Sequence, residues 1–269
     1  MSRFFLRLFN GAFSLVMAVI LLIAGFYAGF ALWDNERIYT AAENVQAELL
    51  SFKPLLEETD EETGWQGPSF EELLAINPDV VAWVTLDGTA VDYPVLQGEN
   101  TLEYINTDVF GNFALAGSIF ADSQCTADYT EPYWLVYGHD MVNSLMFGDL
   151  SLYKDEAFFA ENRTGTLILP SKAYSLTTFA CILIEASDDL VFEPDKGARE
   201  LAELLEYARE NAVHMDEDVI NALAERCRGE DLPKIIALTT CSSEFTNVRT
   251  VILCEVTDYV PAAKEVVEG

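Results

Sequence analysis

The N-terminus contains an uncharged run that strongly limits what the first part of this chain can become. Residues 8–33 carry no Asp, Glu, Lys or Arg. As a helix this run would be about 39 Å long, enough to cross the roughly 30 Å hydrocarbon core of a bilayer. Arg3 and Arg7 precede it, whereas Asp34 and Glu36 follow it. This arginine bias predicts a cytoplasmic N-terminus, with the rest of the chain outside the cell.

A cleaved signal peptide is the alternative interpretation of the same run. Gly29 and Ala31 supply small residues at the spacing of a cleavage site. The run is nevertheless longer than the usual apolar core of about 7–15 residues, which favours an uncleaved anchor. Both interpretations place the body of the protein outside the cell.

The charge of the chain is confined to the part that follows this run. All 45 acidic residues lie there, against 15 Lys and Arg in the whole chain, and the net charge is -30. Such a chain would repel nucleic acid, so we expect no nucleic-acid partner. With 51% hydrophobic residues, it is also unlike a disordered acidic chain.

Changes in charge and the positions of Gly and Pro predict how the chain is divided into segments. A helix is predicted over 35–56, and five acids within 57–62 then indicate a solvated linker. The expected segments are a cytoplasmic tip (1–7), a transmembrane anchor (8–33), a helical and acidic stalk (34–68), a catalytic domain (69–258) and a C-terminal tail (259–269).

Short strands dominate the large domain. After a capped helix at 69–76, strands are predicted at 80–86 and 89–96, where Asp87-Gly88 indicates a type I′ hairpin turn. Further strands are predicted at 117–121, 133–137, 166–169, 174–184, 234–240 and 249–256. Helices at 196–212 and 216–228 precede the last two strands. The pattern predicts a mixed β-barrel with a helical insertion before the penultimate strand.

The cysteines do not form a metal-binding pattern. They are Cys125, Cys181, Cys227, Cys241 and Cys254. No CxxC pair occurs, and His139 and His214 do not complete a zinc site at a familiar spacing, so no metal or cofactor is expected. Cys181 and Cys254 lie in apolar runs and are expected to be buried, whereas Cys125 lies in a polar loop and is the best candidate for an exposed thiol.

Three reactive side chains come where apolar strands begin or end. His139 and Cys241 each follow such a strand, and Arg249 opens the last one. A Cys thiolate can attack a carbonyl, a His can move a proton near neutral pH, and an Arg can hold an oxyanion. A buried Cys, a strand-end His and a surface Arg without a joint function would have the same pattern.

Several motifs in order resemble those of class B sortases. They are 137–141 (YGHDM), 146–150 (MFGDL), 238–241 (LTTC) and Arg249, after 77–84 (NPDVVAWV), 87–89 (DGT), 92–95 (DYPV) and 117–120 (GSIF). The resemblance covers about residues 70–257. Any one of these motifs is weak evidence, but their common order behind an N-terminal anchor is strong.

The resemblance implies a closed eight-stranded sortase-type β-barrel with extra N-terminal helices and a long helix in the late insertion. Sortases are membrane-anchored cysteine transpeptidases of Gram-positive bacteria. They cleave a C-terminal sorting signal of a secreted protein through a thioester, which an amine on a peptidoglycan precursor or a pilin lysine then resolves. By motif, Cys241 is the nucleophile, His139 the general acid and base, and Arg249 the oxyanion or substrate clamp.

Neighbouring residues carry weaker expectations. Thr240 and Thr239 precede the nucleophile and could support the oxyanion, although β-branched residues also suit a strand. Asp140 follows His139 where many class B sortases have Asn. Glu244 places an acid near the clamp, either in a solvated loop or selecting basic substrates. His214, between two helices, is expected at the surface or at a cap.

Two other functions remain open on the sequence alone. A membrane-tethered cysteine peptidase would use the same Cys and His but would pass the thioester only to water. A catalytically silent surface binding module would not need the thiol at all.

Overall fold

The computed structural model describes residues 2–54, 56, 70–229, 231–241 and 248–259. The chain divides into two units, Met1–Ala42 and Glu43–Gly269. Helix α1 spans Ser2–Leu49 without a break. The first unit consists of the part of this helix up to Ala42, and the rest of the helix belongs to the second unit. Among the described residues, α1 with the turn that follows it is the one helix long and apolar enough to cross a membrane. The acidic linker at 57–62 lies outside the described residues.

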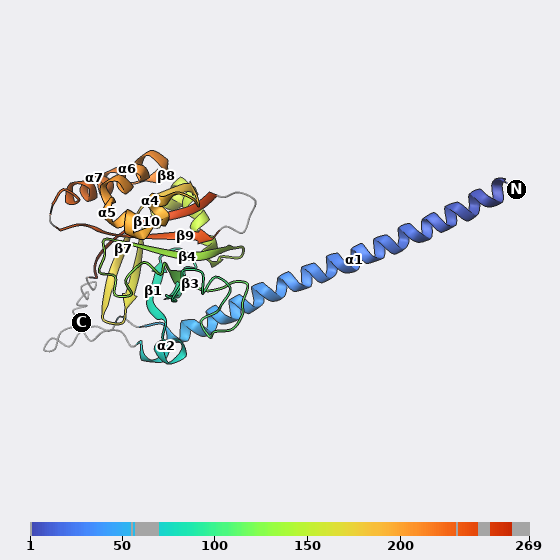
Figure 1. Cartoon of the computed structure of the whole chain (residues 1–269), viewed down its shortest axis with the longest axis horizontal. Helices are drawn as coiled ribbons and strands as arrows, with labels where there is room; N and C mark the ends of the chain where they lie inside the picture. The colour runs from blue at the N-terminus through green and yellow to red at the C-terminus, as the bar shows by residue number, and fades with distance from the viewer. Residues whose placement is uncertain (1, 55, 57–69, 230, 242–247, 260–269) are drawn as a thin grey trace, which may run out of the picture. The chain divides into compact units, whose positions relative to one another are not determined.

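The second unit is built on a closed barrel (Figure 1). Its eight strands are β1 (Val80–Leu86), β2 (Asp92–Leu96), β3 (Ile119–Ala121), β4 (Tyr133–Met141), β6 (Thr164–Leu169), β7 (Lys172–Glu185), β9 (Lys234–Cys241) and β10 (Val248–Asp258). Their order is β10-β9-β4-β3-β2-β1-β6-β7, and the pairing of β7 with β10 closes it. The β2–β3 and β4–β9 pairs are parallel. The expected closed eight-stranded barrel is thus confirmed.

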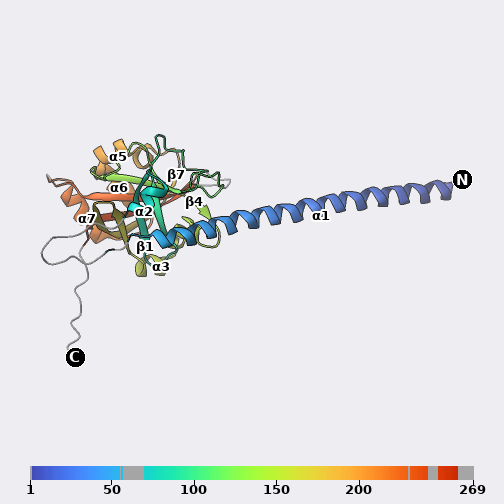
Figure 2. The ribbon, with the colours of Figure 1, turned by 90° about the horizontal axis from the view of Figure 1, so that it is seen from below.

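Two helical segments pack against this barrel. The short helix α2 (Glu71–Ile76) lies beside β1 in both ribbon views (Figure 2). Its Leu73 joins Leu49, from the end of α1, in one apolar cluster with Trp83 of β1 and Phe120 of β3. All four side chains are almost fully buried. Such burial stabilises the unit by roughly 1.5–3 kcal/mol for each large side chain.

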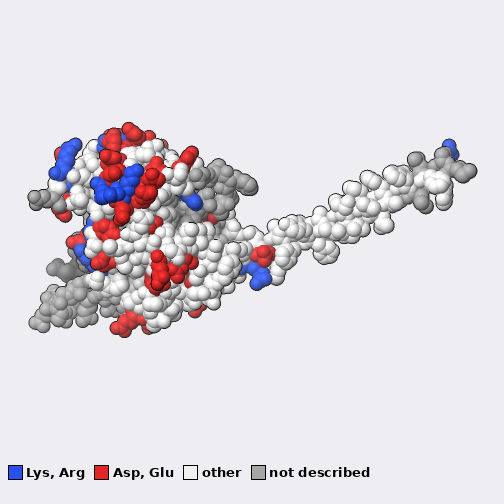
Figure 3. All heavy atoms as spheres, viewed as in Figure 1, with Lys and Arg blue, Asp and Glu red and all other residues white. Residues whose placement is uncertain are grey.

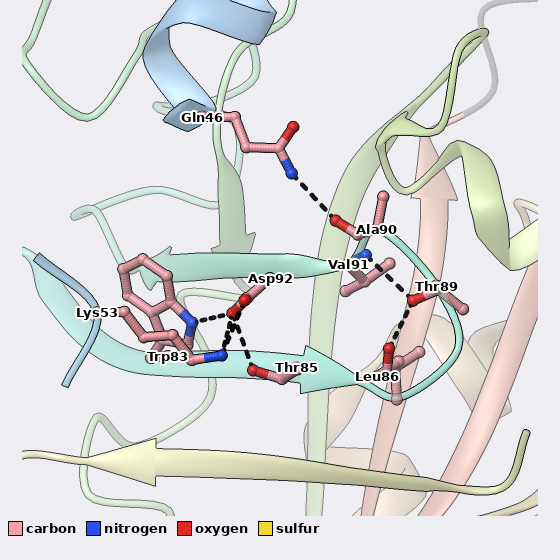
Figure 4. A network of polar contacts seen from close by, with 9 residues as sticks. All are labelled: Gln46, Lys53, Trp83, Thr85, Leu86, Thr89, Ala90, Val91 and Asp92. Atoms are coloured by element: carbon pink, nitrogen blue, oxygen red, sulfur yellow. Dashed lines mark hydrogen bonds and ion pairs between the residues drawn. The ribbon is translucent and has the colours of Figure 1, made fainter. Parts of the chain in front are cut away.

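Polar contacts fix the end of α1 to the β1–β2 hairpin (Figure 4). The Gln46 amide donates to the Ala90 carbonyl at 3.1 Å, and the Lys53 ammonium lies 2.8 Å from the Asp92 carboxylate. The same carboxylate accepts from the Trp83 indole at 2.6 Å and from the Thr85 hydroxyl at 3.0 Å. Part of the expected stalk therefore packs directly on the barrel.

The β1–β2 connection differs from the predicted type I′ turn. That turn needs positive φ at both central residues, but only Gly88 has it, at 77°. The second strand begins at Asp92 rather than at residue 89. The Thr89 hydroxyl donates to the Leu86 carbonyl at 2.8 Å and accepts from the Val91 N–H at 3.1 Å (Figure 4). These side-chain hydrogen bonds stabilise a longer connection, which explains the failure of the two-residue prediction.

The insertion before β9 is helical, as predicted, but it contains no single long helix. It consists of α4 (Asp189–Phe192), α5 (Pro194–Arg199), α6 (Leu201–Asn211), strand β8 (Ala212–Met215) and α7 (Glu217–Arg226). The predicted apolar face of α6 is buried. Strand β8, which no sequence pattern indicated, pairs with β7 and carries His214. A second short strand, β5 (Leu145–Met146), pairs with β4.

Acidic side chains gather on the surface of this insertion (Figure 3). Glu203, Glu206 and Glu210 of α6 are exposed to solvent. Arg209 pairs with Glu206 at 2.9 Å, and such exposed pairs contribute little stability. The negative charge is therefore mainly a solvated exterior.

Asp216 is expected to stabilise this insertion in a pH-dependent way. Its carboxylate accepts from the Val219 N–H at 3.0 Å and pairs with Arg163. Both contacts lower the pKa of Asp216 below its ordinary value of 3.8. This stabilisation is fully present above that ordinary value and is lost as the pH falls through the lower folded-state pKa.

We therefore expect Asp216→Ala to lower the free energy of unfolding by about 1 kcal/mol at pH 7. Denaturant unfolding curves at pH 7 and at pH 3 measure this change. The difference in the free energy of unfolding between the variant and wild type should be smaller at pH 3. Glu217→Ala is the matched control, since Glu217 is an exposed acid in the same helical turn. An equal loss at both pH values would contradict the role given to the carboxylate.

Candidate active site

The parallel pairing of β4 with β9 brings two of the predicted residues together. His139 and Cys241 are partners in this register, each near the end of its strand. Parallel strands end at the same edge of a sheet, so two residues 102 positions apart in sequence become neighbours. The side chain of Cys241 and residues 242–247, which include Glu244, lie outside the described part of the chain.

Arg249 reaches the same edge from the other side of β9. In the antiparallel β9–β10 pair, Val251 lies opposite Thr239, so two residues further on Arg249 comes level with Cys241. The Arg249 guanidinium lies 3.4 Å from the Thr240 carbonyl oxygen, to which it donates. A permanently charged group is thus held one residue from the candidate nucleophile.

The two threonines have structural contacts. Thr239 is fully buried, and Thr240 is nearly so. The Thr240 hydroxyl accepts from the Thr250 N–H at 3.2 Å, which fixes the start of β10 next to the end of β9. Thr240 therefore helps to place Arg249.

His139 is half-buried, and its ring is anchored. Its Nε2 lies 2.8 Å from the carbonyl oxygen of Ile105. A carbonyl can only accept, so Nε2 must carry the proton in this contact. The His139 carbonyl in turn accepts from the Phe147 N–H at 2.9 Å. Ile105 was not indicated by the sequence, because a backbone carbonyl leaves no motif.

The hairpin that follows His139 is partly buried. Met146 and Phe147 are buried, and Met141 is half-buried. Asp140 is exposed and lies opposite Met146 in the β4–β5 pair.

The other cysteines are poor nucleophiles. Cys125 is buried, which overturns the expectation of an exposed thiol, because its loop folds back on the barrel: the Gln97 amide donates to the Cys125 carbonyl at 2.7 Å. Burial raises the pKa of Cys125, and it raises the pKa values of Cys181 and Cys254 to about 12. These thiols therefore stay protonated at neutral pH. The expected burial of Cys181 and Cys254 is confirmed.

The remaining polar candidates do not form a metal site. His214 lies on β8, and its Nε2 is 2.9 Å from the Lys154 carbonyl oxygen. Within the described ranges, no group of three or more His, Cys, Asp and Glu side chains could hold a metal ion.

Known proteins with similar sequences and folds agree on one family, although no protein-family model matches the chain. Sortase B of Listeria monocytogenes is 25% identical over 233 residues, which cover 86% of this chain and 89% of that protein. Sortase B of Staphylococcus aureus is 26% identical over 191 residues, covering 70% and 75% respectively.

A solved structure is similar to this chain in both fold and sequence. The crystal structure of Spy0129, a Streptococcus pyogenes class B sortase involved in pilus biogenesis, matches with a TM-score of 0.62 at 32% identity. The match covers 70% of this chain and 98% of that one. With the closed barrel and its late helical insertion, these similarities show that the chain belongs to the class B sortases, a family of cysteine transpeptidases.

Proposed function

We propose that this chain is a membrane-anchored sortase in which Cys241 is the nucleophile, His139 the general acid and base, and Arg249 the oxyanion or substrate clamp. The observation that carries this assignment is the β4–β9 register, which pairs His139 with Cys241, while Arg249 donates to the carbonyl of Thr240. Each of the three supplies one requirement of acyl transfer.

In the first half-reaction, the Cys241 thiolate attacks the carbonyl carbon of the scissile peptide bond. The S–C bond forms, the C–N bond breaks, and the His139 imidazolium gives its proton to the leaving amine. In the second half-reaction, an acceptor amine attacks the thioester carbonyl and passes a proton to His139. The S–C bond then breaks and the thiolate returns, so the cycle balances without a cofactor.

Arg249 acts where negative charge develops on the carbonyl oxygen. Its fork of N–H donors suits both a substrate carbonyl and an oxyanion. The contact with the Thr240 carbonyl limits its movement, so part of the ordering is complete before the substrate binds. The supporting roles proposed for Thr240 and Thr239 are indirect, through the placement of β9 and β10.

The membrane part of the proposal rests on α1. Its apolar side chains from Phe9 to Trp33 are largely exposed, as expected for a segment that lipid would cover. The arginines before this run and the acids after it favour a cytoplasmic N-terminus and an extracellular catalytic unit. We propose 1–7 as a cytoplasmic tip, 8–33 as the anchor, 34–68 as the stalk, 69–258 as the catalytic domain and 259–269 as a tail.

The proposed substrate is the sorting signal of a secreted protein, and the acceptor is an amine on a peptidoglycan precursor or a pilin lysine. A structure of Staphylococcus aureus sortase B in a substrate complex matches this fold with a TM-score of 0.62 at 25% identity, over 71% of this chain and 85% of that one. Spy0129 is involved in pilus biogenesis, which makes a pilin acceptor worth testing.

A peptide library tests this proposal. The full chain in detergent micelles is incubated with the library and a panel of amines, and the products are read by mass spectrometry. We expect cleaved peptides ligated to at least one amine. If every amine gave only hydrolysis, the protein would be a peptidase. If neither product formed with any peptide, the binding-module interpretation would be favoured.

A further inference from the structure

The ring of His139 makes a specific contact outside the strand pair that holds Cys241. Its Nε2 donates to the carbonyl oxygen of Ile105 at 2.8 Å. Ile105 precedes His139 by 34 residues and belongs to the connection between β2 and β3. A carbonyl oxygen accepts and cannot donate, so this contact selects the ring form with a proton on Nε2. Only Nδ1 is then left to exchange a proton with the substrate.

The Ile105 carbonyl is itself fixed by its neighbours. The Ser118 N–H donates to the Tyr104 carbonyl at 3.0 Å, and the Ser118 hydroxyl donates to the Thr107 carbonyl at 2.8 Å. The Tyr104 hydroxyl donates to the Asp79 carboxylate at 2.6 Å. Because these bonds tie residues 104–107 to the barrel, the carbonyl is a rigid acceptor.

Gly117 permits this arrangement. It has a φ of 58°, and a Cβ there would lie 2.3 Å from the Ile105 carbonyl oxygen and 2.7 Å from that of Tyr104. Both distances are far below van der Waals contact, and the atoms met are backbone. Any side chain at 117 would therefore displace the carbonyl that His139 uses.

We propose that the backbone carbonyl of Ile105, seated on Gly117, is a positioning group for catalysis by His139. It holds the imidazole in one orientation with Nε2 protonated, and it makes Nδ1 the nitrogen that transfers the proton. This proposal rests on the general acid and base role proposed for His139. A group that orients a catalytic His in this way acts through the His and does not touch the substrate.

The chain offers a matched control for Gly117. Gly111 lies in the same connection and also has a positive φ, at 78°, but a Cβ there would meet nothing within 4 Å. Gly117→Ala and Gly111→Ala therefore both place Ala at positive φ, whereas only Gly117→Ala displaces the Ile105 carbonyl.

The tautomer of His139 is read directly by NMR of the full chain in micelles, labelled with ¹⁵N in its histidine rings. The chain has only two histidines, so His214→Gln assigns both sets of signals. In wild type and in Gly111→Ala we expect neutral His139 to carry its proton on Nε2. In Gly117→Ala we expect a mixture of the two tautomers.

Activity provides a second, separate measurement, on the peptide and amine found by the library assay. General acid–base catalysis contributes about 10²–10⁴-fold, so a mispositioned ring should lose part of it. We expect Gly117→Ala to lower kcat about 10-fold with little change in KM, and Gly111→Ala to leave both near wild type. Ser118→Ala removes a tether of the same segment without adding an atom, and it should cause smaller changes in the same directions.

The positioning role of Ile105 and the proposed function of the protein are contradicted by different outcomes. A folded Gly117→Ala that keeps the Nε2–H tautomer and wild-type kcat would overturn the positioning role, and so would a mixed tautomer with unchanged kcat. If Gly117→Ala does not fold, the same criteria apply to Ser118→Ala. The proposed function fails separately: His139→Gln with full activity would remove the catalytic role of His139, whatever the tautomer spectra show.

Discussion

Cys241→Ala is expected to lower the rate of transpeptidation by about 10⁴-fold or more, because the thioester cannot form without the thiol. The four other cysteines do not replace it. Three are buried thiols that stay protonated at neutral pH, and burial raises the pKa of Cys227 as well. Intact-mass spectrometry of the enzyme with substrate peptide should show an acyl adduct in wild type and none in Cys241→Ala.

Cys227→Ala is the matched control for this experiment. Cys227 is half-exposed at the end of α7, outside the β4–β9 edge, so its loss should leave transfer activity unchanged. Circular dichroism should show both variants folded. An acyl adduct that persisted in Cys241→Ala would refute the assignment of the nucleophile.

Arg249→Lys is expected to lower kcat/KM by about 10²–10³-fold, the usual cost of removing one oxyanion donor. Lysine keeps the positive charge but not the planar fork of donors, so it cannot both bond the Thr240 carbonyl and point donors at a developing oxyanion. If the clamp acts in the transition state, kcat falls; if it only holds the substrate, KM rises instead. Steady-state kinetics on the substrate found by the library assay separate these cases.

Arg226→Lys controls for a general effect of replacing an arginine. Arg226 lies on α7 and pairs at 2.7 Å with Glu255 of β10, the strand that also carries Arg249. It therefore contacts this strand away from the edge that holds the candidate site. The activity of the Arg226→Lys variant should stay close to that of wild type. Equal losses in the two variants would show that Arg249 acts through the stability of β10 rather than through the reaction.

The barrel was predictable because its strands are short apolar runs separated by turn residues, and these local signals survive in the fold. The failures come where distant contacts override local patterns. Asp87-Gly88 predicts a two-residue hairpin turn, but hydrogen bonds of the Thr89 side chain stabilise a longer connection. Cys125 lies in a polar loop, yet Gln97, 28 residues earlier, holds its backbone against the barrel. Strand β8 has no clear pattern of its own and exists because it pairs with β7.

The candidate site also contains residues that the sequence could predict and residues that it could not. His139, Cys241 and Arg249 were predicted because their side chains carry the chemistry and their motifs keep a recognisable order. Ile105 was not, because its part is played by a backbone carbonyl that any residue could supply. Gly117 begins the motif at 117–120, but its close approach to that carbonyl exists only in the fold.

The sequence by itself determined the long apolar helix, the barrel class and the candidates for the reactive residues, since these depend on periodicity, charge and side-chain chemistry along the chain. Only the tertiary structure decided which of these residues meet, through the parallel register of β4 and β9. It also decided which nitrogen of His139 lies against the carbonyl of Ile105. Register and orientation depend on contacts between residues far apart in sequence, and such contacts exist only once the barrel has closed.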